Sequence, residues 1–201
     1  MKRLYCILLL LLGTTTLSAQ SWDDILKELT SGAATELVDQ LTGGKLTATA
    51  IQGTWNYKEP AVRFESDDML SNLSSSAIES TITPKLEKAY QFVGIKAGAA
   101  SFTFQSDNTF TATLGKKELK GTYTFDPESH TMQFSFDAKL LGSMSAKAYI
   151  DGSKLQLVFP VNKLLQLIKS VGSNISYLQT IIKMLENYES VYLGFGFERG
   201  A

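Results

Sequence analysis

Cysteine and histidine are almost absent from this chain of 201 residues, which has one of each. A single cysteine cannot form an internal disulfide, and a single histidine cannot supply a histidine-rich metal site. Charge is also balanced, because 19 basic and 20 acidic side chains leave a formal net charge of -1. Without a basic excess there is no general attraction for nucleic acid. We therefore expect no metal, no cofactor and no nucleic-acid partner.

Long hydrophobic runs are missing too, since a membrane-spanning helix needs about 20 apolar residues. The longest run, Ile7 to Leu12, lies at the start of the chain. Lys2 and Arg3 precede it and small residues follow it as far as Ala19, an order typical of a signal peptide. We predict a signal peptide over residues 1–19 that is cleaved after Ala19. Cys6 stands before the apolar run instead of closing it, which argues against a lipid anchor.

Residues 20–201 are then the exported part, and we expect them in the periplasm or outside the cell. Cys6 is lost with the leader, so this part must be held together by its core without disulfides. A hydrophobic fraction of 44% with 19% charged residues excludes a disordered chain. The length suits a single domain over residues 20–201, with no membrane span.

Apolar residues recur at helical spacing in three regions. Residues 20–45 are predicted to hold an amphipathic N-terminal helix. Residues 66–93 are predicted to insert two short helices, the second beginning at Pro84. Residues 161–188 are predicted to form another helical pair before the last strand, with the break at residues 172–174.

From Ile51 onward the apolar period changes to two, which is typical of antiparallel strands with one buried face. Turn sequences such as Asp107-Asn108 and Asp151-Gly152 favour hairpins between these segments. A final strand is predicted over Val191 to Glu198. Closing such a sheet removes its exposed edges. The predicted fold is mainly β with helical insertions (α+β): an antiparallel meander of about eight strands closed into a barrel.

Gly53-Thr54-Trp55 stands on the first predicted strand, just after a helix. This resembles the G-x-W motif of lipocalins, in which the tryptophan packs beneath an N-terminal helix and a late arginine lies over it. The resemblance implies that Arg199 covers Trp55. The insertion over residues 66–93 looks more like the portal lid of intracellular fatty-acid-binding proteins, and the T-D-W motif of lipocalins is not evident.

Nearly the whole exported part is similar to a lipocalin-like family of exported Bacteroidetes proteins, which is classed as a domain of unknown function. Many members have a double glycine after the first lid helix, where this chain has Leu73-Ser74-Ser75-Ser76. The resemblance implies a calycin-like barrel and an exported protein, and it carries no catalytic residues. The segments that carry it are Gly53–Tyr57, Pro60–Ser66, Phe102–Phe104, Gly121–Asp126, Lys163–Leu165 and Leu193–Phe195.

Few residues suggest catalysis. His130 follows a serine in a tight turn, but neighbours in one turn rarely converge on one substrate atom. Asp67-Asp68 begins a predicted helix, where acidic side chains favour the helix dipole. A cluster of lysines around one hairpin is interpreted as a solvated turn: Lys116, Lys117 and Lys120. We therefore predict a non-enzymatic protein.

Aromatic residues dominate the rows predicted to face inward, where an eight-stranded barrel either fills with side chains or holds one small ligand. The leading hypothesis is a small apolar or lipid-like ligand inside the barrel, oriented by the hydroxyl of Tyr57 or Tyr123 and covered by residues 66–93. The alternative is an envelope protein-interaction or inhibitor module with a solid barrel core. The predicted pocket lining is Trp55, Tyr57, Phe102, Phe104, Phe110, Tyr123, Phe125, Phe134, Phe136 and Phe159.

Overall fold

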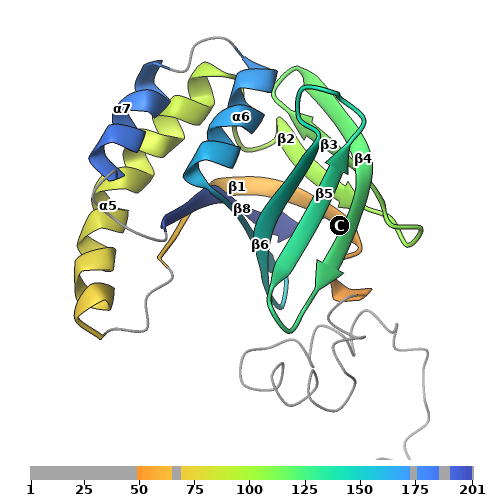
Figure 1. The fold of residues 1–201 in the computed structure, drawn as a ribbon, viewed down its shortest axis with the longest axis horizontal. Coiled ribbons are helices and arrows are strands. Elements are labelled where there is room, and N and C mark those ends of the chain that lie inside the picture. The colour runs from red at the N-terminus through yellow and green to blue at the C-terminus, as the bar shows by residue number, and fades with distance from the viewer. Residues whose placement is uncertain (1–48, 65–68, 173–175, 186–190, 201) are drawn as a thin grey trace, which may run out of the picture.

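The computed structural model describes residues 49–64, 69–172, 176–185 and 191–200. The predicted signal peptide, the N-terminal helix over residues 20–45 and Asp67-Asp68 all lie outside these ranges. Within them the chain forms one β-barrel with helices at one end (Figure 1).

Eight antiparallel strands close into a barrel in the order in which they occur in the chain, and β8 returns to pair with β1. The predicted meander is therefore confirmed. Inward and outward side chains alternate along the strands, as in β5, where every second residue is buried. The strands are β1 (Gly53–Phe64), β2 (Ala100–Phe104), β3 (Thr109–Leu114), β4 (Lys117–Asp126), β5 (Thr131–Phe136), β6 (Ser143–Asp151), β7 (Lys154–Pro160) and β8 (Val191–Arg199).

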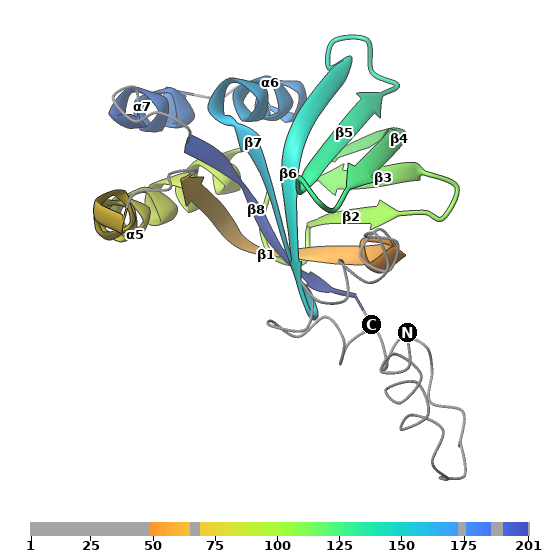
Figure 2. The same ribbon diagram turned by 60° about the horizontal axis from the view of Figure 1, so that its bottom comes forward.

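Three helices gather at the end of the barrel where β1 ends and β8 begins (Figure 2). They are α5 (Met69–Phe92), α6 (Val161–Val171) and α7 (Ser176–Leu185). We call this the helical end. The opposite end, where β1 begins and β8 finishes, is called the closed end. It carries the turns between β2 and β3, between β4 and β5, and between β6 and β7.

The helix α5 continues through Pro84 without a break, so the prediction of two short helices there is wrong. A proline inside a helix removes one backbone hydrogen bond and costs about 3 kcal/mol. Around this position Ile82, Leu86 and Tyr90 are fully buried or nearly so. Burying a large apolar side chain stabilises by about 1.5–3 kcal/mol, so three of them outweigh the proline. The predicted helical pair over residues 161–188 is found, because α6 and α7 are separate helices.

The strand β1 is longer than the sequence pattern indicated. It pairs with β2 only from Gly53 to Asn56, whereas its pairing with β8 runs on to Phe64. A bulge after Tyr57 shifts the register shortly before Pro60. Proline is tolerated at a bulge or along an unpaired edge, because no partner strand needs its N–H. Beyond the short seam with β2, β1 is in contact with α5.

Candidate functional site: the barrel interior and its two ends

The inward-facing aromatic rings contact one another across the barrel. Phe102, Phe104, Phe110 and Phe134 have ring centroids 5.0–6.5 Å apart, within the range of favourable aromatic pairs. Phe134 also contacts Phe159, at 5.9 Å between centroids. All five rings have at most 1% of their surface exposed. The centre of the barrel is a continuous aromatic cluster.

Small residues in the inward rows are buried beside the aromatic rings. Ala112, Ala146 and Ala148 are 0–2% exposed. Ala112 stands opposite Phe102 on β2, and Ala146 stands opposite Met132 on β5. Each alanine makes space for a larger neighbour, which is how a close-packed core is filled.

Nine of the ten residues predicted to line a pocket are buried, at 7% exposure or less. Phe125 is the next-to-last residue of β4, near the closed end, and it is only half-buried. Three interior aromatic residues were missed: Tyr90, Phe195 and Phe197. The alternation along the last strand carried the signal for the two phenylalanines, whereas Tyr90 reaches the barrel from a helix. Ligand contact by these residues stays a prediction.

Trp55 and Arg199 build the closed end. The indole of Trp55 is fully buried, and its Nε1 donates a hydrogen bond to the carbonyl oxygen of Ile51 at 2.7 Å. The guanidinium carbon of Arg199 lies 4.3 Å from the centre of the Trp55 ring. Its Nη1 and Nη2 donate to the carbonyl oxygens of Gln52, at 2.9 Å, and Ala50, at 2.5 Å. The arginine expected over the tryptophan is therefore in place.

Tyr90 of α5 anchors the helical end. Its ring lies 5.0 Å from Phe195 and 6.2 Å from Tyr57, measured between centroids. Its hydroxyl donates to the carbonyl oxygen of Gly194 at 2.9 Å, so the buried phenol is satisfied. Burial holds the pKa of Tyr90 well above its usual value, because ionisation would leave a charge in apolar surroundings.

Two glycines let the C-terminal end of α5 sit close against the barrel. A Cβ on Gly115, in the β3–β4 turn, would lie 2.6 Å from the carbonyl oxygen of Val93. Gly115 also has φ +62, a backbone conformation that favours glycine. A Cβ on Gly172, after α6, would lie 2.8 Å from the Val93 side chain. The α5–β2 connection, the β3–β4 turn and the end of α6 thus meet around Val93.

The two tyrosines expected to orient a ligand have different surroundings. The hydroxyl of Tyr123 donates to the carbonyl oxygen of Gln105 at 3.0 Å, toward the closed end. Burial raises the pKa of Tyr57, and the negative charges of Glu87 on α5 and Glu59 on β1 raise it further. Tyr57 therefore marks the place where the aromatic interior meets polar groups under α5.

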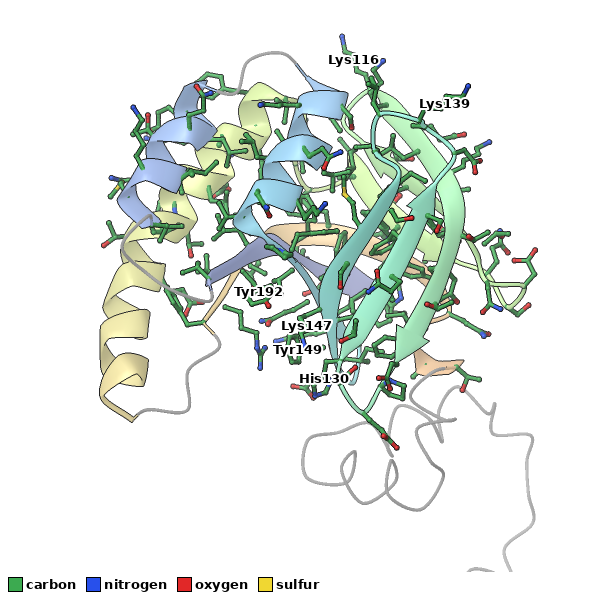
Figure 3. All side chains as sticks on the ribbon, viewed as in Figure 1. Lys116, His130, Lys139, Lys147, Tyr149 and Tyr192 are labelled. Atoms are coloured by element: carbon green, nitrogen blue, oxygen red, sulfur yellow. The ribbon has the colours of Figure 1, made fainter. Side chains whose placement is uncertain are left out.

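In the turn before His130, the serine is hydrogen-bonded to a carboxylate. The hydroxyl of Ser129 donates to Asp126 at 2.5 Å, and this hydrogen bond lowers the pKa of Asp126. His130 has φ 53, and its ring packs on Tyr149 with centroids 4.6 Å apart. The guanidinium of Arg63 lies 3.5 Å from the centre of the same Tyr149 ring. His130 and Tyr149 belong to an outer-surface cluster that continues to Lys147 and Tyr192 (Figure 3).

A family model described as a lipocalin-like domain, DUF4923, matches residues 25–199. The chain belongs to this family. The match includes both Trp55 and Arg199, so the resemblance inferred from the sequence is confirmed.

The chain can also be compared with a solved structure. The chain is similar to a solved structure of a DUF4847 family protein from Bacteroides vulgatus ATCC 8482, with 16% identity and a TM-score of 0.38. That comparison covers 79% of this chain and 97% of the other. No curated protein matches.

Three searches cover the described part of this lipocalin-like domain. No group of three or more His, Cys, Asp or Glu side chains in it is placed to hold a metal ion. None of its helices has both the length and the apolar character needed to cross a membrane. Each of its buried side-chain nitrogen and oxygen atoms has a hydrogen-bond partner.

Proposed function

We propose that this chain is an exported, non-enzymatic lipocalin-like module that acts through its outer surface, as an interaction or inhibitor module of the cell envelope. Its barrel core is structural. The basic, apolar and small-residue order of residues 1–19 supports export. The Ser129–Asp126 hydrogen bond and the stacking of His130 on Tyr149 support the absence of a nucleophilic site.

One observation carries the proposal: the interior side chains, including the small ones, are buried against each other. Ala146 is 2% exposed and faces Met132, while Phe134 beside it is fully buried. An open-cavity lipocalin binds by burying an apolar ligand against such side chains. Here the protein's own rings already occupy that position.

Enlarging Ala146 tests whether the core is solid. In a filled barrel, Ala146→Leu forces neighbouring rings to move and lowers the free energy of unfolding by about 1–3 kcal/mol. Ser143→Leu is the control, because Ser143 lies on the same strand with its side chain exposed. Urea unfolding monitored by tryptophan fluorescence measures both. A wild-type midpoint for Ala146→Leu would contradict the solid core.

A second candidate is binding of a small apolar or lipid-like ligand inside the barrel. Two observations favour it: β1 pairs with β2 over a short seam only, and α5 lies beside β1 beyond that seam. Displacing α5 would open this side, with Tyr57 at the opening. In this case native mass spectrometry of the protein purified from its own envelope would find a co-purifying small molecule. Ala146→Leu would then reduce its retention while leaving stability unchanged.

A further inference from the structure

One basic side chain on the outer face of the barrel has no acidic partner among the described residues. Arg63, on β1, is half-buried, and its Nη1 donates a hydrogen bond to the side-chain oxygen of Gln156, on β7, at 2.9 Å. Its guanidinium also lies over the ring of Tyr149, on β6. Both partners are uncharged, and no ion pair in the described part of the chain includes Arg63. The guanidinium is therefore held in place by uncharged groups.

Arg63 and Gln156 reach each other over a glycine of the strand between them. Arg63 stands opposite Tyr192 on β8, and Gln156 stands opposite Gly196 on the same strand. The path between the two side chains therefore crosses β8 at Gly194, the residue midway along this outward row. A side chain at this position would block the path, so the glycine lets Arg63 extend across β8.

The sheet curves around this glycine. A Cβ on Gly194 would collide with the carbonyl oxygen of Leu157 on β7, and β1 and β7 approach each other across β8. Ala61 and Val158 stand opposite Gly194 on the two flanking strands and belong to the outward rows, yet they are 5% and 0% exposed. Neither is a member of the main core cluster. Arg63 therefore lies on a curved, partly covered stretch of the outer face and not on an open, flat sheet.

Most hydrogen-bond donors of Arg63 are unused by the described side chains and backbone groups. A guanidinium carries five N–H donors, and the bond to Gln156 uses one of those on Nη1, so the edge formed by Nε and Nη2 stays free. The ring of Tyr149 holds the guanidinium plane, and that ring packs in turn against His130, with centroids 4.6 Å apart. Donors that are fixed in advance lose little entropy when they bind a ligand.

Charges of both signs surround Arg63, so the site works at short range. Glu59, two outward positions before Arg63 on β1, lies beside Gly196, and Arg199 is turned to Trp55. The remaining charged residues of β1, β6, β7 and β8 and of the β4–β5 turn are Lys58, Lys147, Lys154, Asp126, Glu128, Asp151 and Glu198. Attraction for an anion therefore comes from the hydrogen bonds of Arg63 itself, and Glu59 opposes it.

We propose that Arg63 is the centre of a binding site for a small oxyanion, the carboxylate or phosphate group of a soluble ligand. The free edge of the guanidinium donates two parallel hydrogen bonds to two oxygens of that group, the geometry in which arginine binds oxyanions best. Tyr192, opposite Arg63 on β8, and Tyr149 border the site. The inference goes beyond the proposed function, because it names a small-molecule site on the outer surface and does not require a protein partner.

The position of Arg63 favours a small ligand over an acidic protein surface. Lys147, the outward residue before Tyr149 on β6, donates to the carbonyl oxygen of Ser129 at 2.9 Å, so its ammonium is directed to the β4–β5 turn. In Figure 3, Lys147, Tyr149 and Tyr192 lie on this face of the barrel. An acidic protein surface gains most from several projecting basic side chains, whereas one half-buried guanidinium suits a single small group.

Nuclear magnetic resonance tests the proposal at the atoms that bind. The isotope-labelled protein, purified as the cell makes it, is titrated with sodium acetate or with sodium phosphate at constant pH and ionic strength. Sodium chloride at the same ionic strength is the reference. We expect the Nε–H resonance of Arg63 to shift and saturate with acetate, phosphate or both, and to stay unchanged with chloride. The anion that saturates the shift at the lower concentration identifies the group.

Variants of Arg63 separate its charge from its planar fork, with the backbone amide resonances of Tyr192 and Gln156 as the readout. Arg63→Met should bind at least about tenfold more weakly, because two charge-assisted hydrogen bonds are lost. Arg63→Lys keeps the charge but loses the fork, and it should also bind more weakly than the wild type.

Two further variants test position and the opposing charge. Lys117→Met removes one positive charge from β4, on the far side of the closed barrel, and should bind as the wild type does. Glu59→Gln removes the carboxylate that opposes the anion and should bind about twofold more tightly.

Three results would overturn the oxyanion site. The first is a wild-type Arg63 resonance that does not saturate with either anion. The second is an Arg63→Met variant, or an Arg63→Lys variant if the first does not fold, that binds as tightly as the wild type. The third is equal weakening by Lys117→Met and Arg63→Met, which would reduce the effect to general charge. None of these results depends on the Ala146→Leu measurement, so failure of the site and failure of the solid core are read separately.

Discussion

The two ends of the barrel are sealed by different physical means. At the closed end, Trp55 and Arg199 stand opposite each other on β1 and β8, and two backbone carbonyl groups accept the arginine's hydrogen bonds. At the helical end, α5 and α6 cover the barrel with buried apolar side chains, supported by the Tyr90 hydrogen bond. The closed end therefore depends on a few directional groups. The helical end spreads its stability over many contacts, each of which matters less.

The same contrast separates stability from exposed surface. The buried groups of the closed end are satisfied locally, and its turns present carboxylates to solvent. The helical end combines a buried face with exposed Leu140 and Phe92. Loops and caps of this kind, on a rigid barrel, are where binding surfaces are usually found. Single substitutions at the two ends test this division.

Removing the tryptophan should have the largest effect. Trp55→Ala empties a fully buried position at the closed end and should lower the free energy of unfolding by about 3–5 kcal/mol. Phe92→Ala at the helical end is the control, because its ring is 61% exposed and its loss should change stability by less than about 0.5 kcal/mol. Urea unfolding followed by circular dichroism measures both. Equal losses would show that the two ends do not differ in this way.

Replacing the arginine should have the next largest effect. Arg199→Met keeps much of the side chain's bulk but leaves the carbonyl groups of Gln52 and Ala50 without their donor, which should cost about 2–4 kcal/mol. Arg63→Met is the matched control, because Arg63 stacks on Tyr149 at the outer surface, where such a contact contributes about 0.5–1 kcal/mol. Thermal unfolding of the two variants side by side distinguishes them. If Arg199→Met lost no more stability than the control, the hydrogen bonds from Arg199 to Gln52 and Ala50 would not stabilise the closed end as proposed.

Deleting the Tyr90 hydroxyl should have a smaller effect. Tyr90→Phe leaves the ring contacts with Phe195 in place and removes the hydrogen bond to Gly194, at a cost of about 0.5–1.5 kcal/mol near neutral pH. The unfolding midpoint in urea at neutral pH measures it. No measurable loss would mean that the anchor of α5 is apolar alone.

Alkaline pH sharpens the same test. The folded-state pKa values of Tyr90 and Tyr57 are raised, so their contribution is fully present below the unfolded-state pKa of about 10. Above it the unfolded chain ionises while the folded chain resists, and stability falls by about 1.4 kcal/mol per pH unit for each group. Tyr90→Phe removes one of these groups, so its stability should approach that of the wild type as pH rises above about 10. A constant gap between pH 8 and pH 11 would contradict the buried phenol.

The sequence was most informative where a pattern reports one local rule. The strands could be predicted because alternation shows which face of a strand is buried, and the Trp55–Arg199 contact followed from the position of a motif. The predicted helix break at Pro84 was wrong for a physical reason. The local penalty of a proline is visible in the sequence, whereas the burial of Leu86 and Tyr90 that offsets it is not.

How the interior side chains pack could not be predicted for a related reason. Ala112 opposite Phe102 has the same alternation whether the alanine widens a pocket or accommodates the ring. That difference depends on how rings from several strands fit together in space. The stacking of His130 on Tyr149 joins a turn to a strand on the outer face, where periodicity carries no signal.

The pairing of β1 with β8 has a consequence for the order of folding. Residues 53–64 meet residues 191–199, while β2 to β7 each pair with strands next to them in the chain. Contacts between neighbouring hairpins form quickly, whereas joining distant segments must first overcome the entropy of closing a long loop. The β1–β8 ladder is therefore expected to form after the hairpins between β2 and β7, so that closure of the barrel is a late step of folding.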